Sequence, residues 1–256
     1  QVQILPPQPN QARLARVFCC SHPGGKRRRT GHLGTSDMAK RVAIIGSAIG
    51  GGAAQIIDAL SGARDQIAIA IFDKDERAAG ENVLGVPVAG DSSIETLQQH
   101  HADGFFDAAV IAIGGNLAER ARIFHALRDA GIPTANVIDP TAHIRSAARL
   151  GTGNVILAGT FVGPHVVLGD NCYVVGGTSI QHDSRVGNHC YFGPEVAIGG
   201  RVVIGDRVRF EIRSGAKSGL RAGDDSTISS GCILTADLAA GATALAADYV
   251  VVSSKS

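Results

Sequence analysis

The stretch ILAGTFVGPHVVLGDNCYVVGGTSIQHDSRVGNHCYFGPEVAIGGRVVIGDRVRF (residues 156–210) carries the pattern that decides the fold. Large apolar residues recur in it at every sixth position, and the same frame continues on both sides. Its seventeen positions are Ile144, Leu150, Ile156, Val162, Leu168, Val174, Ile180, Val186, Phe192, Ile198, Ile204, Phe210, Ala216, Ala222, Ile228, Leu234 and Ala240. Fourteen of these are Ile, Leu, Val or Phe, and glycine follows nine of the seventeen, so each period combines a core residue with a bend. A fixed period of six predicts the stacked coils of a parallel β-helix.

Each hexad contains the residues of one short strand and one turn. A large residue fills the interior, a small one two places earlier packs beside it, and glycine often relieves the bend that follows. The repeat resembles that of the hexapeptide acyltransferases, in which three hexads form one left-handed coil of 18 residues. The resemblance implies five to six coils here, with residues 18 apart stacked at a strand spacing of about 4.8 Å. Cys172 and Cys190 form such a pair on small inward positions, and we expect both to be core residues and not a redox couple.

The chain before the repeat alternates short apolar runs with segments of helical period. The predicted strands are RVAII (41–45), IAIAIF (67–72), AAVIAI (108–113) and TANVI (134–138), and the predicted helices span 53–60 and 117–130. Strands separated by helices indicate a parallel sheet with crossover helices. The predicted fold class is therefore an α/β Rossmann-like N-terminal domain followed by an all-β left-handed parallel β-helix.

A glycine-rich loop, GSAIGGG (46–52), follows the first predicted strand. Residues without a Cβ atom let backbone N–H groups approach a phosphate at a helix N-terminus, where the helix dipole also favours negative charge. Asp73, at the end of the second strand, is placed to accept hydrogen bonds from a ribose or a base. The spacing G-x-x-x-G-G-G is not the dinucleotide fingerprint, so the loop indicates phosphate binding more than NAD binding. The alternative is that the glycines only permit a tight strand-to-helix turn.

The segment QHDSRVGNH (181–189) departs from the plain chemistry of the repeat. His182 lies two residues past the inward-facing Ile180, where the chain turns outward, and Asp183 follows it. A neutral imidazole accepts a proton near pH 7, and an adjacent carboxylate raises its basicity and fixes its tautomer, which suits a general base. One coil later stands Gly200, whose backbone N–H is a suitable donor to a thioester carbonyl. The alternative is an exposed histidine on a turn beside a solvated aspartate.

The combination of IGSAIGGG (45–52) and QHDSRVGNH resembles one family, from Met38 to about Val252. It is the sugar O- and N-acyltransferases of bacterial surface-glycan pathways, of the sialic-acid O-acetyltransferase and bacillosamine-pathway aminosugar acetyltransferase type. The resemblance implies acetyl transfer from acetyl-CoA to an amine or hydroxyl of a nucleotide-activated sugar, with His182 as base and Asp183 tuning it. It assigns the acceptor's nucleotide to Gly46, Ala48, Ile49, Gly50, Asp73, Lys74 and Gly114. It assigns acetyl-CoA to His189, Tyr191, Gly200, Ile212 and Ser230, and no metal is expected.

Some positions depart from the family pattern. Gly50 stands where relatives often carry a histidine, Tyr191 replaces a second active-site histidine, and the closing G-N-P-A motif is missing. These departures keep open a non-catalytic scaffold that binds a nucleotide sugar without turning it over. A γ-type carbonic anhydrase, also a hexapeptide helix, requires three histidines around one zinc ion. The spacings of 17 and 7 between His165, His182 and His189 do not reproduce the close pair of that class.

Three domains are expected along the chain. Residues 1–37 form a disordered leader or a segment added for expression, 38–139 a Rossmann-like nucleotide-sugar-binding domain, and 140–256 the β-helix acyltransferase domain. The leader is basic and contains prolines, and three consecutive arginines without an aromatic neighbour are too weak a footprint to predict a nucleic-acid partner. Because the leader shares no repeat with the rest, we expect its removal to cost little stability.

Composition limits the partners and the cellular location that we expect for the chain. A net charge of +1 selects no charged partner. No apolar run approaches the roughly 18–20 residues of a membrane span, so none is expected. Five cysteines, an odd number without framework spacing, favour the reducing cytoplasm. The resemblance further implies a homotrimer with the active site between neighbouring subunits.

Overall fold

The computed structural model of the chain describes residues 39–46, 49 and 51–246. The predicted leader, 1–37, lies outside the described residues. So do Ala48 and Gly50, two of the positions assigned to the nucleotide. The fold below is that of the described part of residues 37–256, which form one compact unit.

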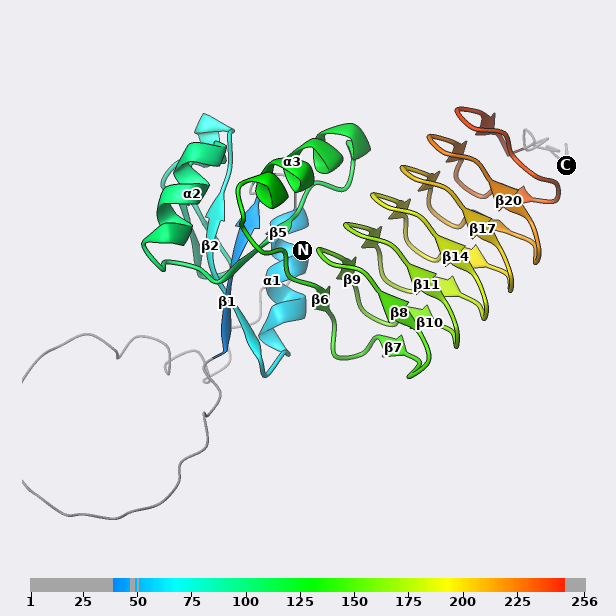
Figure 1. Ribbon diagram of the computed structural model, residues 1–256, viewed down its shortest axis with the longest axis horizontal. Helices are drawn as coiled ribbons and strands as arrows, with labels where there is room; N and C mark the ends of the chain where they lie inside the picture. Colours follow the sequence, from blue (N-terminus) through cyan, green and yellow to red (C-terminus); the bar gives the residue numbers. More distant parts are fainter. Residues whose placement is uncertain (1–38, 47–48, 50, 247–256) are drawn as a thin grey trace, which may run out of the picture. The chain divides into compact units, whose positions relative to one another are not determined.

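The first half contains a five-stranded sheet in the order β3-β4-β2-β1-β5 (Figure 1). Its strands are β1 (Lys40–Ile45), β2 (Gln66–Phe72), β3 (Asn82–Val83), β4 (Val86–Gly90) and β5 (Ala108–Ile111). β1 pairs in parallel with both β2 and β5, β2 pairs in parallel with β4, and β3 runs antiparallel to β4. Because β1 lies between β2 and β5, the strand order reverses there. In open α/β sheets the carboxyl ends of the strands at such a switch point hold the ligand.

Three α-helices cover this sheet: α1 (Gly52–Ser61), α2 (Ile94–Ala102) and α3 (Leu117–Asp129). α1 packs on one face, where Ile56 and Leu60 join the cluster of Val42 and Ile44. α2 and α3 pack on the other face, around Phe72. The predicted helices 53–60 and 117–130 are confirmed. Two elements were not predicted from the sequence: α2, which is mostly polar and has one buried residue, and the short β3–β4 hairpin.

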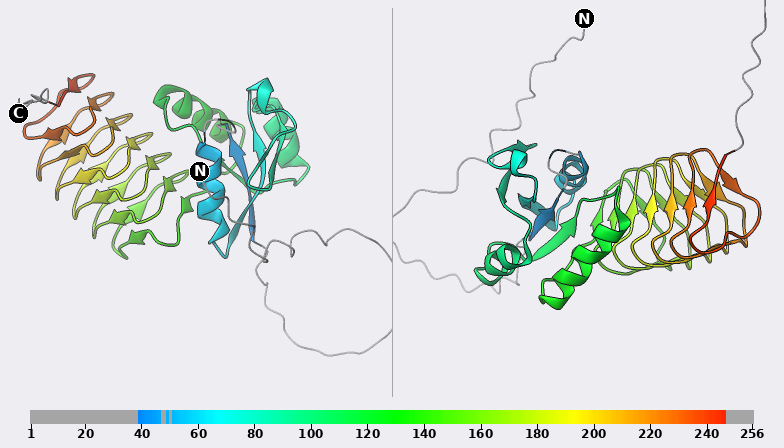
Figure 2. Two further views of the ribbon diagram at one scale, coloured as in Figure 1. Left: turned by 180° about the vertical axis from the view of Figure 1, so that it is seen from behind. Right: turned by 90° about the horizontal axis from the view of Figure 1, so that it is seen from above.

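The second half is a parallel β-helix whose strands are each two residues long (Figures 1 and 2). They form three sheets, named here by their first strands. The β7 sheet comprises β7 (His143–Ile144), β10 (Phe161–Val162), β13 (Ser179–Ile180), β16 (Ala197–Ile198), β19 (Gly215–Ala216) and β22 (Ile233–Leu234). The β8 sheet comprises β8 (Arg149–Leu150), β11 (Val167–Leu168), β14 (Arg185–Val186), β17 (Val203–Ile204) and β20 (Arg221–Ala222). The β6 sheet comprises β6 (Val137–Ile138), β9 (Val155–Ile156), β12 (Tyr173–Val174), β15 (Tyr191–Phe192), β18 (Arg209–Phe210), β21 (Thr227–Ile228) and β23 (Thr243–Ala244).

The period of the coil and its core agree with the predicted repeat. Equivalent strands pair 18 residues apart, as in Phe161 with Ser179, which confirms a coil of three hexads. The second residue of each strand points inward, and the rings of Phe192 and Phe210 stack with centroids 5.4 Å apart. Cys172 is fully buried in this core, as is Cys190, which confirms that both are core residues.

The frame slips in the last coil, and the prediction that Ala240 faces inward is wrong. Leu238 donates its N–H to the carbonyl of Arg221, so Leu238 follows Ala222 by sixteen residues instead of eighteen. β23 repeats this offset, because Thr243 pairs with Thr227. Leu238 packs against the core whereas Ala240 is exposed. A turn shortened by two residues thus puts a leucine where the regular frame offers only an alanine.

The predicted strand 134–138 is divided between the two halves of the unit. Thr134 forms a bridge with Ala109, at the edge of the first sheet. Val137 and Ile138, three residues later, form β6 and pair with β9. The two halves are therefore joined within five residues.

Arg120, on α3, adds a buried polar link between the halves. Its guanidinium is fully buried and donates to the carbonyl oxygens of Ile111 (2.5 Å) and Asn171 (2.8 Å). Three further, longer bonds reach the carbonyls of Ile113, Gly153 and Cys172. Burial lowers the pKa of Arg120 to about 10, so it remains charged at neutral pH. One side chain thus binds the end of β5 and the first coils together.

Candidate active site

A cleft of about 570 Å³ opens at the switch point of the first sheet. Gly46 at the end of β1, Ile49 in the glycine loop, and Asp73 and Lys74 after β2 all line it. Gly46 has φ +78°, and a Cβ atom there would lie 3.0 Å from Cγ1 of Ile113. Glycine is therefore required where β1 approaches the segment after β5. The structure brings these four predicted nucleotide-binding residues into one cleft.

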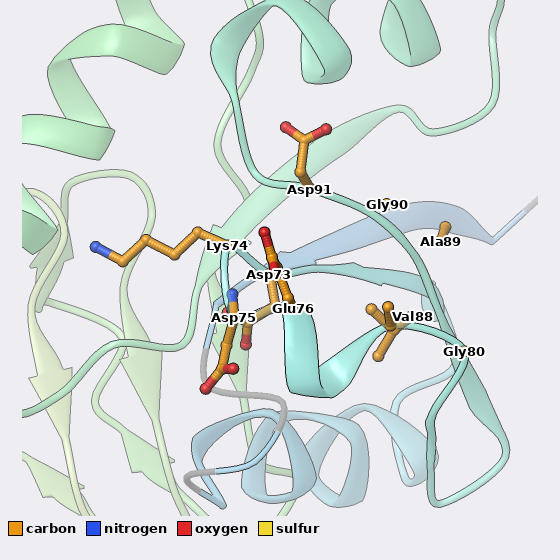
Figure 3. A pocket seen from close by; sticks show the side chains of 10 residues that line it. Asp73, Lys74, Asp75, Glu76, Gly80, Val88, Ala89, Gly90 and Asp91 are labelled. Atoms are coloured by element: carbon orange, nitrogen blue, oxygen red, sulfur yellow. Dashed lines mark hydrogen bonds between the residues drawn. The ribbon is translucent and has the colours of Figure 1, made fainter.

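Carboxylates surround the end of β2, in a smaller hollow of about 280 Å³ beside the cleft (Figure 3). Figure 3 shows Asp73, Asp75 and Glu76 together there, with Asp91 across from them. Asp73 accepts a hydrogen bond from the N–H of Asp75 (3.0 Å), which fixes the turn. Lys74 donates to Glu119 across the cleft (3.2 Å). Hydrogen bonds from Arg122 and then from Lys74 hold the pKa of Glu119 at about 2, so this carboxylate stays charged.

A second pocket, of about 330 Å³, lies between the two halves of the unit. Gly51 and Gly52 line it at the start of α1, Gly114 lines it from the loop after β5, and Tyr191 lines it from β15. α1 has no side-chain cap at its N-terminus, and its N-cap, Gly51, has φ +81°. Uncapped N–H groups at a helix N-terminus are suited to an anion such as a phosphate. The pocket therefore offers a place for the phosphates of a nucleotide.

Tyr191 belongs to this pocket, although the resemblance assigned it to acetyl-CoA. A Cβ atom on Gly114 would lie 3.1 Å from the Tyr191 ring, so this contact depends on glycine. The guanidinium of Arg209 lies 5.1 Å from the ring centroid and donates to the Gly115 carbonyl (2.7 Å). The hydroxyl of Tyr173 donates to Gln55 on α1 (3.0 Å). This column of Tyr173, Tyr191 and Arg209 was not predicted from the sequence, although its members are 18 residues apart.

His182 and Asp183 lie at the corner between the β7 and β8 sheets, which we call the His182 corner. His182 Nδ1 lies 2.8 Å from Oδ2 of Asp183, and their side chains are 48% and 46% exposed. An N–H at Nδ1 leaves Nε2 as the free lone pair of the neutral ring. The pKa of Asp183 is lowered, first by this hydrogen bond. The predicted pair therefore exists with the geometry of an oriented base.

Gly200 stacks on His182 one coil later, as the period predicted. A Cβ atom on Gly200 would lie 2.7 Å from His182 Nε2, so any other residue there would displace the imidazole. The N–H of Gly200 donates to the Ser218 hydroxyl (3.1 Å). A thioester carbonyl that used this N–H would take the place of that hydroxyl oxygen.

The remaining residues assigned to acetyl-CoA lie at other corners of the coil. His189 is buried at the corner between the β8 and β6 sheets, where its Nδ1 lies 2.9 Å from the Asn171 side-chain amide. Its ring centroid lies 5.1 Å from that of His125. Burial lowers the pKa of His189 to about 4, and the charge of His125 makes a smaller contribution in the same direction. Ile212, 46% exposed, and Ser230 lie one coil apart at the corner between the β6 and β7 sheets. Within one chain the structure does not bring these residues to His182.

The three histidines that a γ-type carbonic anhydrase needs do not converge. His165 and His182 share one corner, whereas His189 is buried at another. Within the described part of the chain, no group of three or more His, Cys, Asp or Glu side chains is placed to hold a metal ion. Within the same residues, no helix is long and apolar enough to cross a bilayer.

Solved structures share both the fold and the order of these parts. Perosamine N-acetyltransferase PerB of Caulobacter crescentus, in complex with CoA and GDP-perosamine, is 31% identical with a TM-score of 0.71. The match covers 82% of this chain and 95% of that one. A variant of that enzyme with one histidine replaced, bound to the same two ligands, matches at 30% identity over the same shares, with a TM-score of 0.73. The chain belongs to the hexapeptide-repeat sugar acyltransferases. The β-helix of this acyltransferase is accordingly left-handed.

A more distant structure has the same fold. The acetyltransferase domain of PglB from Neisseria gonorrhoeae FA1090, in complex with acetyl coenzyme A, is 23% identical with a TM-score of 0.72. The match covers 80% of this acyltransferase and 96% of that domain. No family model matches the chain. No curated protein matches it either.

Proposed function

We propose that this acyltransferase moves the acetyl group of acetyl-CoA to an amine or hydroxyl of a nucleotide-activated sugar in surface-glycan biosynthesis. The observation that carries the proposal is the oriented pair His182–Asp183, packed against Gly200, in a chain that also has a nucleotide-sized cleft. The relative at 31% identity was crystallised with CoA and GDP-perosamine, a ligand pair that such a reaction requires.

The base chemistry follows from the imidazole. His182 Nε2 removes the proton from the acceptor's amine or hydroxyl as its nitrogen or oxygen attacks the thioester carbonyl. The new bond to the acetyl carbon forms, the carbon–sulfur bond breaks, and the CoA thiolate takes up a proton. Asp183 stabilises the imidazolium that exists in between. The Gly200 N–H stabilises the oxyanion of the tetrahedral intermediate by replacing its bond to Ser218. Transfer is direct, without an acetylated enzyme.

The acceptor's nucleotide is proposed to occupy the switch-point cleft. Asp73 and Lys74 contact the base or ribose, and the phosphates lie on the uncapped start of α1. Gly114 supports them from the loop after β5, and Tyr191 closes that pocket from the β-helix. The family resemblance adds Ala48 and Gly50 to the same loop.

A second copy of the chain is needed to complete the site, and we propose a homotrimer. The N-terminal half packs on the β6 sheet, through residues such as Val155 and Tyr173. The His182 corner is the one opposite that sheet, so the cleft and the base lie on different sides of the coil. The outward residues of the β7 sheet carry no charged Lys, Arg, Asp or Glu, from Phe161 through Ala197 to Ile233, whereas the β8 sheet presents Arg149, Arg185 and Arg221. An uncharged flat face is the side on which copies pack.

The proposed location is the cytoplasm. The three cysteines among the described residues, Cys172, Cys190 and Cys232, are all free thiols. Free thiols are typical of reducing compartments.

Release of free CoA thiol in the presence of a panel of nucleotide-linked aminosugars and hydroxy-sugars tests the proposal. The expected result is turnover with at least one of them, and mass spectrometry of the product distinguishes an amide from an ester. Binding of a nucleotide sugar without thiol release would instead support the non-catalytic scaffold.

A further inference from the structure

Asp183 binds a second histidine besides His182. His165 lies one coil earlier at the His182 corner, and its Nδ1 is 3.2 Å from Oδ1 of Asp183. His182 Nδ1 is 2.8 Å from the other oxygen, Oδ2. Each carboxylate oxygen therefore accepts a hydrogen bond from a different imidazole.

The repeat builds this contact. His165 and Asp183 are 18 residues apart and have the same left-handed backbone conformation, with φ of +60° and +59°. The N–H of Asp183 donates to the Pro164 carbonyl (3.0 Å), which fixes the register of the two coils. Residues with equal backbone conformation in stacked coils have parallel Cα–Cβ bonds, so the two side chains are held next to one another.

We propose that His165 is a positioning residue for the reaction: it holds the Asp183 carboxylate in the rotamer that fixes the His182 imidazole with Nε2 toward Gly200. This inference rests on the proposed role of His182 as base. Asp183 is about half exposed, so a single hydrogen bond leaves its carboxylate free to rotate toward solvent. A second bond to the other oxygen removes that freedom.

The charges around Asp183 are few. The hydrogen bonds from His182 and, to a smaller extent, from His165 lower the pKa of Asp183, so it stays ionised at neutral pH. Within the described part of the chain, Asp183 forms no ion pair with a Lys or Arg side chain, Arg201 of the same corner included, and its partners are His182 and His165. Removal of His165 lets the Asp183 carboxylate rotate away from His182. The acidic limb of the pH–rate profile then moves to lower pH, because the imidazolium loses part of its stabilisation.

A double-mutant cycle tests the inference. His165→Ala should lower kcat by about 2- to 10-fold, the rate equivalent of one hydrogen bond, with little change in KM for acetyl-CoA. In an Asp183→Ala background the same substitution should have no further effect, because His165 acts through Asp183. His165→Asn should restore part of the loss, since asparagine tolerates a left-handed backbone and supplies an N–H donor. Arg207→Ala is the matched control: it breaks an equivalent stacked pair, Arg207–Asp225 (2.7 Å), at another corner.

A second measurement does not depend on turnover. Nitrogen-15 NMR of the imidazole rings reports which nitrogen of His182 carries the proton. We expect the Nδ1–H tautomer in the unchanged chain and a mixture of tautomers in His165→Ala. Additive effects in the cycle, or an unchanged tautomer and pH profile in His165→Ala, would overturn the inference. Absence of thiol release from the unchanged chain would count against the proposed function alone, and the NMR result would still decide the role of His165.

Discussion

The proposed general base, His182, needs a lone pair free to accept the acceptor's proton, and its contact with Asp183 through Nδ1 leaves Nε2 for that purpose. The imidazole is confined between Asp183 on one side and Gly200 on the other. This confinement fixes Nε2 without a covalent constraint.

Replacement of His182 by alanine should lower kcat by about 10²- to 10⁴-fold, the usual contribution of a positioned base, and change KM for acetyl-CoA little. Asp183→Asn should have a smaller effect and move the acidic limb of the pH–rate profile to lower pH, because the imidazolium loses its neighbouring charge. Steady-state kinetics with CoA-thiol detection measures both. Nearly full activity in His182→Ala together with lost activity in His189→Ala would show that the roles are reversed.

His189 is expected to make stability depend on pH. Its pKa is about 4 in the folded chain, below the usual value of 6.5, so between pH 6.5 and 4 the unfolded chain binds more protons. This contribution to stability is full above pH 6.5 and is lost as the pH falls toward 4. His189→Asn keeps a residue that tolerates φ +59° and removes the titration. Thermal unfolding at pH 7 and pH 5 should show a smaller loss for the variant, and an equal loss in both chains would refute the assignment.

The sequence predicted correctly the positions of those site residues that follow from the period of 18 or from the end of a strand. His182, Asp183 and Gly200 follow from the period, and Gly46 and Asp73 follow from the ends of β1 and β2. Tyr191 is different, because the period gives its stacking but not what covers its sheet. That depends on the packing of α1 and of the loop after β5, whose Gly114 precedes Tyr191 by 77 positions in the sequence.

At the scale of elements, the regular coil was predictable and its two ends were not. Successive hexads have similar residues, so the sequence does not reveal that the turn before Leu238 is two residues shorter. The one indication is that Leu238 is a larger apolar side chain than Ala240. At the other end, 134–138 has the apolar pattern of a strand, but the pattern does not reveal that Thr134 and Val137 belong to different sheets.

Arg120 joins α3 to the end of β5 and to the first coils, so its removal is expected to lower the stability of the fold. Its replacement by alanine removes the donors of several buried carbonyls and leaves a cavity between α3 and the first coils. We expect a loss of about 2–4 kcal/mol in the free energy of unfolding. Urea denaturation measures it, with Arg128→Ala on the exposed side of α3 as control. A loss no larger than that of the control would show that Arg120 does not join the halves.

At the scale of the whole molecule, the separation of the proposed nucleotide cleft from His182 favours an assembly in which the site forms between copies. If the site forms between copies, light scattering should give about three times the chain mass of 26.3 kDa at micromolar concentration. Ala197→Arg should reduce that mass, because a charge enters the uncharged face of the β7 sheet, whereas Arg185→Glu on the β8 sheet should not. A mass near 26.3 kDa for the unchanged chain would refute the trimer.

Complementation between two inactive variants decides where the site lies. His182→Ala keeps the cleft and lacks the base, whereas Asp73→Arg keeps the base and fills the cleft with a long side chain. In mixed trimers, a site between copies pairs the intact cleft of one variant with the intact base of the other. Random assortment of equal amounts makes about a quarter of such sites complete, and activity should return to about that fraction of the unchanged protein. A site within one chain would stay defective in every copy, so the mixture would remain as inactive as its components.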